Sequence, residues 1–391
     1  MRLLILHQAT VFGGAERTTL NLLSHLNRSI VTHITLAAPA ALRAFMPEVY
    51  DDFVDTAPLI RHGWFGSRES FKPDIEAGTM LIDEVRPDIA LGMMHYSGAV
   101  IALGARRAHH RPRTAASFRG PISEYIRRYE RGFGRLLFLR LVIGLAARAA
   151  DRILVPSQGT ADDTCRHFLG PRARTLVIPN GIDGVEVQVA SREPVVGLEH
   201  LPPDLPMLCV AARLSREKDV DLLIEAFRRL QPTHPCTLAV VGDGPERSIL
   251  EQRIRDWDLG DRVAFVGHRE NVFPYMRKAD IYVHTCQFEG FGYTMLEAMA
   301  CGTPVLATDC PSGPREVLGA GRFGVLVAPS DAGALSSGIA GLLADPGRRE
   351  RLSTLGMERA EDLSLARMAE GYQNAFLDML RRRHPRSAGK A

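Results

Sequence analysis

The stretch that decides the fold runs from Ile281 to Asp309 and reads "IYVHTCQFEGFGYTMLEAMACGTPVLATD". It begins as an apolar, strand-like run and passes through a loop with two glycines. It then continues as a helix-like run over Tyr293–Ala300 and ends in a second apolar run over 304–309. Continuous apolar strands are typical of sheets covered on both faces, and such sheets are parallel. This stretch therefore predicts a strand–helix–strand unit of a parallel α/β sheet.

The same alternation of short apolar runs and longer amphipathic runs continues on both sides of this stretch. The predicted strands are 3–8, 34–39, 88–94, 113–118, 152–157, 176–180, 207–214, 237–243, 262–268, 281–286, 304–309 and 324–328. Two series in tandem predict two doubly wound domains, over 1–180 and 181–364, with a last helix over about 365–385 that packs back on the first domain. The polar, proline- and glycine-containing segment 181–206 is interpreted as the linker. Because ligands of such sheets bind at the carboxyl ends of the strands, we expect a cleft between the two domains.

Composition limits the classes of protein. The chain has 391 residues, 46% of them apolar, which is enough for two separate cores. Its six cysteines show no CxxC spacing, which favours free, small hydrophobic thiols over a disulfide or zinc framework. The start, "MRLLILHQAT", predicts a buried strand rather than a signal peptide. The longest apolar stretch, Leu136–Ala149, contains Arg140 and is shorter than the ~20 residues of a membrane span.

The net charge of +3 is unevenly distributed. From Arg106 to Arg152 there are twelve arginines and only three acidic residues. A basic region beside Leu136–Ala149 favours contact with an anionic membrane or an anionic substrate. The alternative is a general preference for arginine, since the chain has only four lysines. Aromatic residues do not alternate with the arginines in a stacking pattern, so nucleic acid is not an expected partner.

Two loops after predicted strands suit phosphate groups. Gly13 and Gly14 stand between a strand and a helix, where free N–H groups bind anions, although an ordinary turn explains them equally well. The spacing G-x-G-x-x-G of a dinucleotide fold is absent there. Arg213 and Lys218 follow a later strand on one loop, which suits a diphosphate, and solvated surface charge is the alternative.

The opening stretch carries the clearest chemistry. Gly290 and Gly292 leave the backbone N–H groups of this loop free to face an anion at a helix start. Glu297 lies one turn beyond Tyr293, and a carboxylate there can accept two hydrogen bonds from the vicinal diol of a ribose. Glu289, on the loop itself, is placed to accept from a second hydroxylated group. The alternative is a helix cap with incidental glutamates.

These residues resemble a known family. "FEGFGYTMLEAMACGTPVLATD" is similar to the Glu-x7-Glu signature of the retaining GT-B glycosyltransferases of glycosyltransferase family 4. The blocks "GGAER", "VIPNGID", "ARLSREKD", "VVGDGPER", "VAFVGH" and "GVLVAPSD" resemble that family in the same order. The segment "DCPSGPREVL" (309–318) is similar to members that use UDP-linked hexoses or N-acetylhexosamines in surface glycan assembly.

The resemblance implies a role for each residue. Arg213 and Lys218 hold the donor diphosphate, Glu289 contacts the transferred sugar and Glu297 the ribose. The remaining implied donor-binding residues are Gly13, Gly14, Gly267, His268, Gly290, Phe291, Gly292, Tyr293 and Thr294. Glu289, Arg213 and Lys218 are the expected catalytic residues.

The chain departs from the family pattern at one place. Many relatives carry a histidine after the fourth strand of the first domain, where this chain reads "AASFRGPISEY" (115–125) with Arg119. His95, at a neighbouring strand end, is the nearest substitute, and an ordinary partly buried histidine is the alternative. Arg119 is expected to pair either with an acceptor phosphate or with Glu124.

The implied function is that of a retaining hexosyltransferase using a nucleotide sugar, with UDP favoured. The expected acceptor is a lipid-linked saccharide at the inner face of the cytoplasmic membrane. The enzyme is expected to be cytoplasmic and peripheral, and to act without a metal or cofactor, since no D-x-D motif or His/Cys cluster is evident. Two alternatives stay open: a GT-B sugar-nucleotide epimerase or phosphorylase, and a catalytically silent protein that binds nucleotide sugars.

Overall fold

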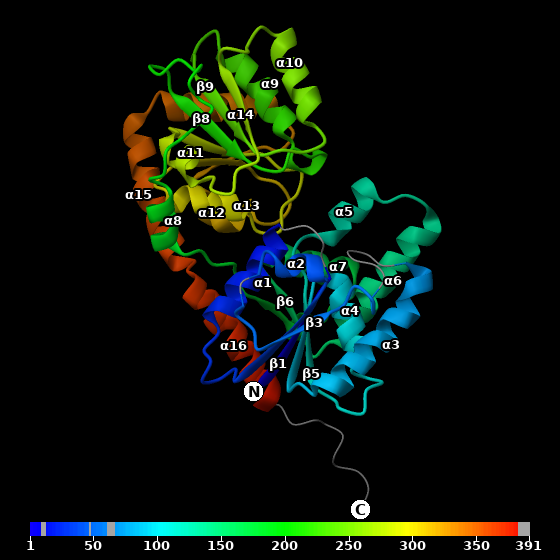
Figure 1. Cartoon of the computed structure of the whole chain (residues 1–391). Coiled ribbons are helices and arrows are strands. Elements are labelled where there is room, and N and C mark those ends of the chain that lie inside the picture. The colour runs from blue at the N-terminus through cyan, green and yellow to red at the C-terminus, as the bar shows by residue number, and fades with distance from the viewer. Residues whose placement is uncertain (9–12, 47, 61–66, 382–391) are drawn as a thin grey trace, which may run out of the picture. The chain divides into compact units, whose positions relative to one another are not determined.

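The computed structural model describes residues 1–8, 13–46, 48–60 and 67–381. The chain divides into two compact units (Figure 1). Unit 1 comprises Met1–Asn180 and the chain from Leu365 onward, and unit 2 comprises Gly181–Ser364. Each unit has its own parallel sheet with helices on both faces, which confirms the predicted α/β class.

Unit 1 is built on seven parallel strands in the order β3-β2-β1-β4-β5-β6-β7. Their bounds are β1 Arg2–His7, β2 His33–Ala38, β3 Asp52–Asp55, β4 Ile89–Met93, β5 Arg113–Ser117, β6 Arg152–Val155 and β7 Thr175–Val177. Strands β2 and β3 follow β1 towards one edge of the sheet, and β5, β6 and β7 follow β4 towards the other edge. The neighbouring pair β1 and β4 is therefore the topological switch point, where open α/β sheets bind ligands.

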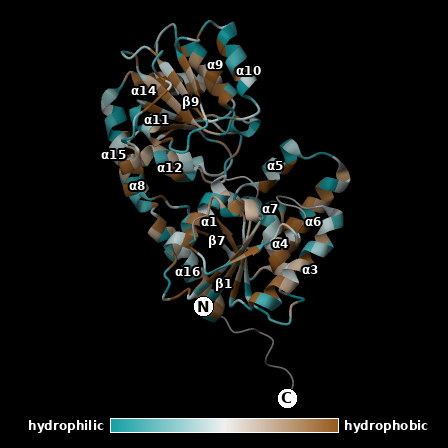
Figure 2. Ribbon diagram, viewed as in Figure 1, coloured by the Kyte–Doolittle hydropathy of each residue, from teal (hydrophilic) through white to brown (hydrophobic). Residues whose placement is uncertain are grey.

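Helices cover both faces of this sheet because the side chains of each strand alternate. In β1, Leu4 and Leu6 contribute to one core, and Leu3 and Ile5 to the other. The first core is closed by α3 Arg68–Val85, α4 His95–Gly104, α5 Ile122–Tyr129, α6 Phe133–Ala149 and α7 Gln158–His167. The second is closed by α1 Gly14–His25, α2 Ala40–Arg43 and α16 Leu365–Arg381. Figure 2 shows the strands between these helices mostly in brown, the colour of apolar residues.

Unit 2 repeats this plan with six parallel strands in the order β10-β9-β8-β11-β12-β13. Their bounds are β8 Met207–Ala211, β9 Thr237–Val241, β10 Val263–Gly267, β11 Ile281–His284, β12 Val305–Thr308 and β13 Val325–Val327. One face carries α8 Gly184–Ala190, α11 Phe273–Lys278, α12 Tyr293–Ala300, α13 Pro314–Val317 and α15 Pro346–Asp362. The other carries α9 Val220–Leu230, α10 Arg247–Asp256 and α14 Ala332–Leu343. The switch point here lies between β8 and β11.

One prediction about the chain's organisation was wrong, and one strand was not predicted. Segment 181–206 is not a free linker, because it forms α8 and places Val187, Leu198 and Leu201 in the core of unit 2. The short edge strand β3 was missed, since its sequence DFVD has aspartates at both ends and no apolar run. None of the described helices combines the length and apolar composition needed to cross a bilayer.

Candidate active site

The switch point of unit 2 brings two loops together, one after β8 and one after β11. The Thr285 hydroxyl donates a hydrogen bond to the Lys218 carbonyl at 2.9 Å, and the Gln287 N–H donates to the Glu217 carbonyl at 2.9 Å. These backbone contacts fix the first loop against the second. They determine where the Lys218 and Glu289 side chains can meet.

Lys218 and Glu289 form a close ion pair. The Lys218 Nζ lies 2.6 Å from Glu289 Oε2, with 27% and 16% of the two side chains exposed. The Gly290 N–H donates to Glu289 Oε1 at 2.9 Å. Burial by itself raises the pKa of Glu289, but the neighbouring Lys218 charge, helped by His284, lowers that pKa to about 2. Glu289 is thus a permanent anion near neutral pH, able to accept hydrogen bonds but not to donate a proton.

The glycine loop lies directly against this pair. Gly292 precedes α12 with φ of 98°, a conformation that favours glycine. A Cβ at Gly292 would lie 2.2 Å from Met295 Cε and 3.6 Å from Glu289 Cγ, so a side chain there would displace Met295 as well as strain the backbone. Gly290, Phe291 and Tyr293 are buried in the same loop, and Thr294 is half-buried. The N-terminus of α12 therefore presents bare backbone beside Glu289.

Glu297 is placed differently from Glu289. It lies one turn along α12 from Tyr293, as predicted, but it is only 1% exposed. The Glu297 side chain is therefore almost fully shielded from solvent in this structure. The assignment of the ribose to Glu297 stays a prediction.

The remaining expected donor residues of unit 2 lie at the carboxyl ends of other strands. Arg213 is exposed on the loop after β8, and no described carboxylate pairs with its guanidinium. Gly267, with φ of 81°, ends β10 and accepts a hydrogen bond from the Gly242 N–H at 2.8 Å. His268 follows it and is exposed. The structure places these residues on one edge of the sheet, without a direct contact to Glu289.

Sequence reasoning missed a cluster at the end of β11. His284, Cys286 and Glu289 bring one potential metal-ligating atom each within 4.8 Å of the others. The expectation of no His/Cys cluster was therefore wrong, although the spacing H-x-C-x-x-E at a strand end could have indicated it. Lys218 already supplies a positive charge at 2.6 Å from the carboxylate, so Glu289 needs no metal ion to balance it. Metal-independent action stays a prediction.

We expect His284 to make the free energy of unfolding depend on pH. Burial and the Lys218 charge outweigh the effect of Glu289 and lower the pKa of His284 from 6.5 to about 4. Between these pH values the unfolded chain binds a proton that the folded chain does not, so stability falls as pH falls through this window. The shift corresponds to a loss of about 3 kcal/mol in the free energy of unfolding.

Chemical denaturation between pH 7 and pH 4.5 measures this loss. The His284→Gln variant should show a flatter dependence on pH. The matched variant His268→Gln, at an exposed histidine, should keep the wild-type slope. Equal slopes for wild type and His284→Gln would contradict the account.

In unit 1, His95 lies at the switch point between β1 and β4. It starts α4 directly after Met94, whose φ of 69° is unusual for a residue with a side chain. His95 is 3% exposed, and burial, followed by the Arg135 charge, lowers its pKa to about 3. It is therefore a neutral, buried imidazole at neutral pH. Its role towards an acceptor stays a prediction.

The start of α1 is anchored by a network that sequence reasoning did not find. His7, at the end of β1, contacts Thr19 Oγ1 through Nδ1 at 2.7 Å and Glu16 Oε1 through Nε2 at 3.1 Å. These three buried side chains fix the first turns of α1, which begins at Gly14 after the exposed Gly13. The preceding residues 9–12 lie outside the described part of the chain.

Arg119 joins four parts of unit 1. Its guanidinium donates to Ser117 Oγ at 3.4 Å, Tyr372 OH at 3.1 Å, Thr18 Oγ1 at 2.9 Å and Asn180 Oδ1. All four partners are neutral, so its positive charge is not balanced by any of them. The alternative pairing with Glu124 was wrong, because that carboxylate accepts from two other arginines, at 127 and 128.

Comparison with known proteins agrees with this architecture. The family model described as "Glycosyltransferase Family 4" matches residues 12–184, and the model "Glycosyl transferases group 1" matches residues 199–359. One relative is the GDP-mannose-dependent alpha-(1-6)-phosphatidylinositol monomannoside mannosyltransferase of Mycolicibacterium smegmatis. It is 31% identical over 278 residues, which span 59% of this chain and 71% of the relative.

A second relative is the N-acetylgalactosamine-N,N'-diacetylbacillosaminyl-diphospho-undecaprenol 4-alpha-N-acetylgalactosaminyltransferase of Campylobacter jejuni. It is 27% identical over 230 residues, which span 59% of this chain and 61% of the relative. The chain spans 50–63% of the length of several curated relatives, this one included.

A solved structure covers nearly the whole chain. HepE from Anabaena, in complex with UDP, superposes with a TM-score of 0.79 at 20% identity, covering 97% of this chain and 100% of that one. This likeness confirms the predicted GT-B fold of two Rossmann-like domains. The chain therefore belongs to the glycosyltransferases of family 4, with a group 1 glycosyl transferase domain in its second half.

Proposed function

We propose that this protein transfers a hexose or N-acetylhexosamine from a UDP-linked donor to a lipid-linked saccharide, with retention of the anomeric configuration. The observation that carries the proposal is the Lys218–Glu289 pair, set beside the bare backbone at the N-terminus of α12. A cation, the N-terminus of a helix and a fixed anion at one sheet edge suit a diphosphate joined to a polyhydroxylated sugar.

The charged side chains of the site suggest a role for each of them in the transfer. The bond between the anomeric carbon and the diphosphate oxygen breaks while a bond to the acceptor oxygen forms on the same face. The acceptor's proton passes to the departing diphosphate. Lys218 has three N–H donors, so it can hold Glu289 and a phosphate oxygen together, and Arg213 supplies a second charge to the leaving group. Glu289, an anion with a pKa near 2, accepts from a sugar hydroxyl and stabilises positive charge on the ring.

The choice of UDP rests on the segment 309–318. In the structure this segment packs on the glycine loop, because the Glu289 N–H donates to the Pro311 carbonyl at 3.2 Å. A Cβ at Gly313 would lie 2.7 Å from the Phe291 carbonyl oxygen. The segment thus supports the donor loop directly. Calorimetric titration with UDP and GDP tests the choice, since stronger binding of GDP would overturn it.

The lipid-linked acceptor and the place at the inner face of the cytoplasmic membrane are supported by two observations. The Campylobacter relative is named for an acceptor that carries diphospho-undecaprenol. In this chain, six arginines and two glutamates lie between Ile122 and Ala149. A basic surface of this kind suits an anionic lipid or its phosphate.

The ribose assignment is tested by the Glu297→Gln variant. We expect its affinity for UDP to fall at least tenfold, because an amide accepts fewer of the ribose hydroxyl hydrogen bonds than a carboxylate. Affinity for pyrophosphate should not change. Calorimetry with UDP and with 2′,3′-dideoxy-UDP completes the cycle. Wild type should bind the dideoxy analogue more weakly than UDP, whereas the variant should bind the two ligands with equal affinity. Equal UDP binding by wild type and variant would remove the assignment.

A further inference from the structure

Helix α6 exposes a row of large apolar side chains on the outside of unit 1. Phe133, Leu137, Leu141 and Leu145 follow each other at every fourth position, with exposed fractions of 82%, 47%, 55% and 44%. Residues spaced by four lie on one face of a helix. The opposite face of α6 is buried in the unit 1 core through Phe138, Leu139, Val142, Ile143, Ala146 and Ala147. The helix is therefore apolar on both sides, although only one side is covered.

A fifth apolar side chain extends this row. Leu169 is 64% exposed and holds φ of 57°, a conformation that costs energy for a residue with a side chain. The preceding residue, Phe168, brings its carbonyl oxygen to 3.4 Å from the position of a Cβ at Gly144 of α6. Leu169 is thus presented to solvent beside α6. We call Phe133, Leu137, Leu141, Leu145 and Leu169 the apolar ridge.

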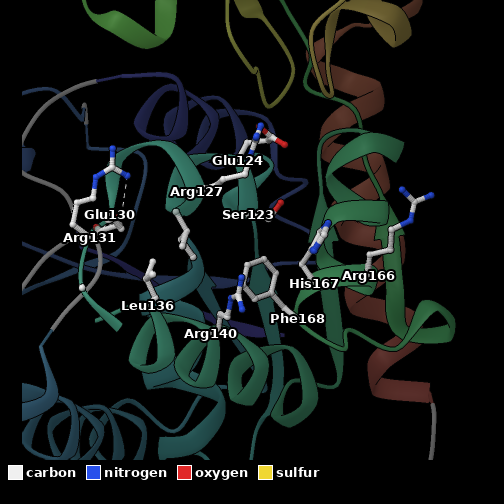
Figure 3. A pocket seen from close by; sticks show the side chains of 12 residues that line it. Ser123, Glu124, Arg127, Glu130, Arg131, Leu136, Arg140, Arg166, His167 and Phe168 are labelled. Carbon is white, nitrogen blue, oxygen red and sulfur yellow. Dashed lines mark hydrogen bonds and ion pairs between the residues drawn. The ribbon is translucent and has the colours of Figure 1, made fainter. Parts of the chain in front are cut away.

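Unpaired positive charge lies next to the ridge. A cavity of about 550 Å³ is lined by residues of α5, the first half of α6 and the end of α7 (Figure 3). Arg140 and Arg166 both line it and are exposed, and neither pairs with a described carboxylate. The two acidic residues of its wall, Glu124 and Glu130, already accept hydrogen bonds from neighbouring arginines. The surface around the ridge therefore carries net positive charge.

We propose that the apolar ridge and the adjoining arginines dock this protein on an anionic lipid bilayer. Four side chains over thirteen residues of helix form a row about 18 Å long, which suits shallow insertion parallel to the membrane rather than a span. Arg140 and Arg166 then meet lipid phosphates at the cavity mouth. A second copy of the chain fits this face poorly, because a two-fold contact would bring its arginines against each other. This inference deepens the proposed function, since it places a lipid-linked acceptor at the unit expected to receive it.

Flotation with vesicles tests the proposal. At low salt, wild type should float with phosphatidylcholine vesicles that contain 30% phosphatidylglycerol. With vesicles of pure phosphatidylcholine it should stay at the bottom of the gradient. The double variant Leu137→Ser/Leu141→Ser should lose at least tenfold in vesicle affinity, and Arg140→Gln about fivefold. The matched controls are Ile249→Ser, at a 51% exposed apolar residue of α10, and Arg348→Gln, at an exposed arginine of α15. Both controls should bind like wild type.

The outcomes separate this proposal from the proposed function. UDP affinity should be the same in wild type and in the ridge variants, because the ridge lies in unit 1 and the Lys218–Glu289 pair in unit 2. Loss of flotation with intact UDP binding supports docking. Docking is overturned if wild type does not float with the anionic vesicles, or if the ridge variant floats as well as wild type. Either result overturns it whether or not UDP binding is intact. A ridge variant that turns a dimer into a monomer in analytical ultracentrifugation would also overturn it, in favour of self-association.

Discussion

Replacing Lys218 with methionine is expected to lower the free energy of unfolding of unit 2 by about 3–5 kcal/mol and to abolish measurable turnover. Methionine keeps the length of the side chain but removes the charge that lies 2.6 Å from Glu289. The carboxylate, 16% exposed and held anionic by that charge, would be left buried without its partner. Chemical denaturation at pH 7 and a donor-hydrolysis assay measure the two effects.

The double variant Lys218→Met/Glu289→Gln separates stability from catalysis. With both charges removed no buried carboxylate remains unpaired, so the free energy of unfolding should return to within about 1 kcal/mol of wild type. Turnover should stay absent, since the cation for the leaving diphosphate is still missing. A single Lys218→Met variant as stable as wild type would show that the pair contributes nothing to unit 2.

Arg213→Met is expected to slow turnover by about 10²–10³-fold and to leave stability unchanged. The Arg213 side chain is exposed and has no described carboxylate partner, so its removal breaks no ion pair in the folded chain. Its charge matters most when further negative charge accumulates on the diphosphate as the bond to the sugar breaks. Most of the loss should therefore appear in kcat rather than in KM.

The matched control is Arg216→Met, three residues further along the same loop. Arg216 is exposed and lies 3.5 Å from Glu246, an ion pair that is solvated and worth little. This variant should retain turnover within about twofold of wild type. If Arg213→Met and Arg216→Met had equal activities, Arg213 would not be the group that neutralises the leaving diphosphate.

The strands were predictable because both faces of each sheet are covered. "LLILH" and "TLAVV" are continuous apolar runs, and such runs become central strands of a doubly wound sheet. The edge strand β3 has only one neighbour and is half exposed, so its sequence carries no such run. Helix α8 was missed for a related reason, since Val185 and Val189 are 77% and 66% exposed and only Val187 is buried.

The site was predictable only in part. The glycines and the two glutamates are close together in the chain, so their spacing already indicates a loop and a helix start. The pairing of Lys218 with Glu289 joins positions 71 residues apart, and the contacts of Arg119 with Asn180 and Tyr372 span 61 and 253 residues. Such pairings depend on strand order, which no local pattern encodes. The sequence indicated a basic region beside the apolar stretch Leu136–Ala149, but not which of its leucines are exposed, because an exposed leucine and a buried leucine look alike in a sequence.

Unit 2 interrupts unit 1 in the chain, since Gly181–Ser364 is continuous while the core of unit 1 needs α16 from beyond it. Under the proposed function, the Lys218–Glu289 pair and α12 that bind the donor are therefore encoded in one uninterrupted segment with two junctions, whereas unit 1 is split between the two flanks. Recombination that exchanges only this segment keeps every strand and helix of the host unit. A single crossover inside this segment instead covers the host's unit 1 sheet with α16 from the other gene. New donor specificities should therefore spread between such genes by replacement of the middle segment.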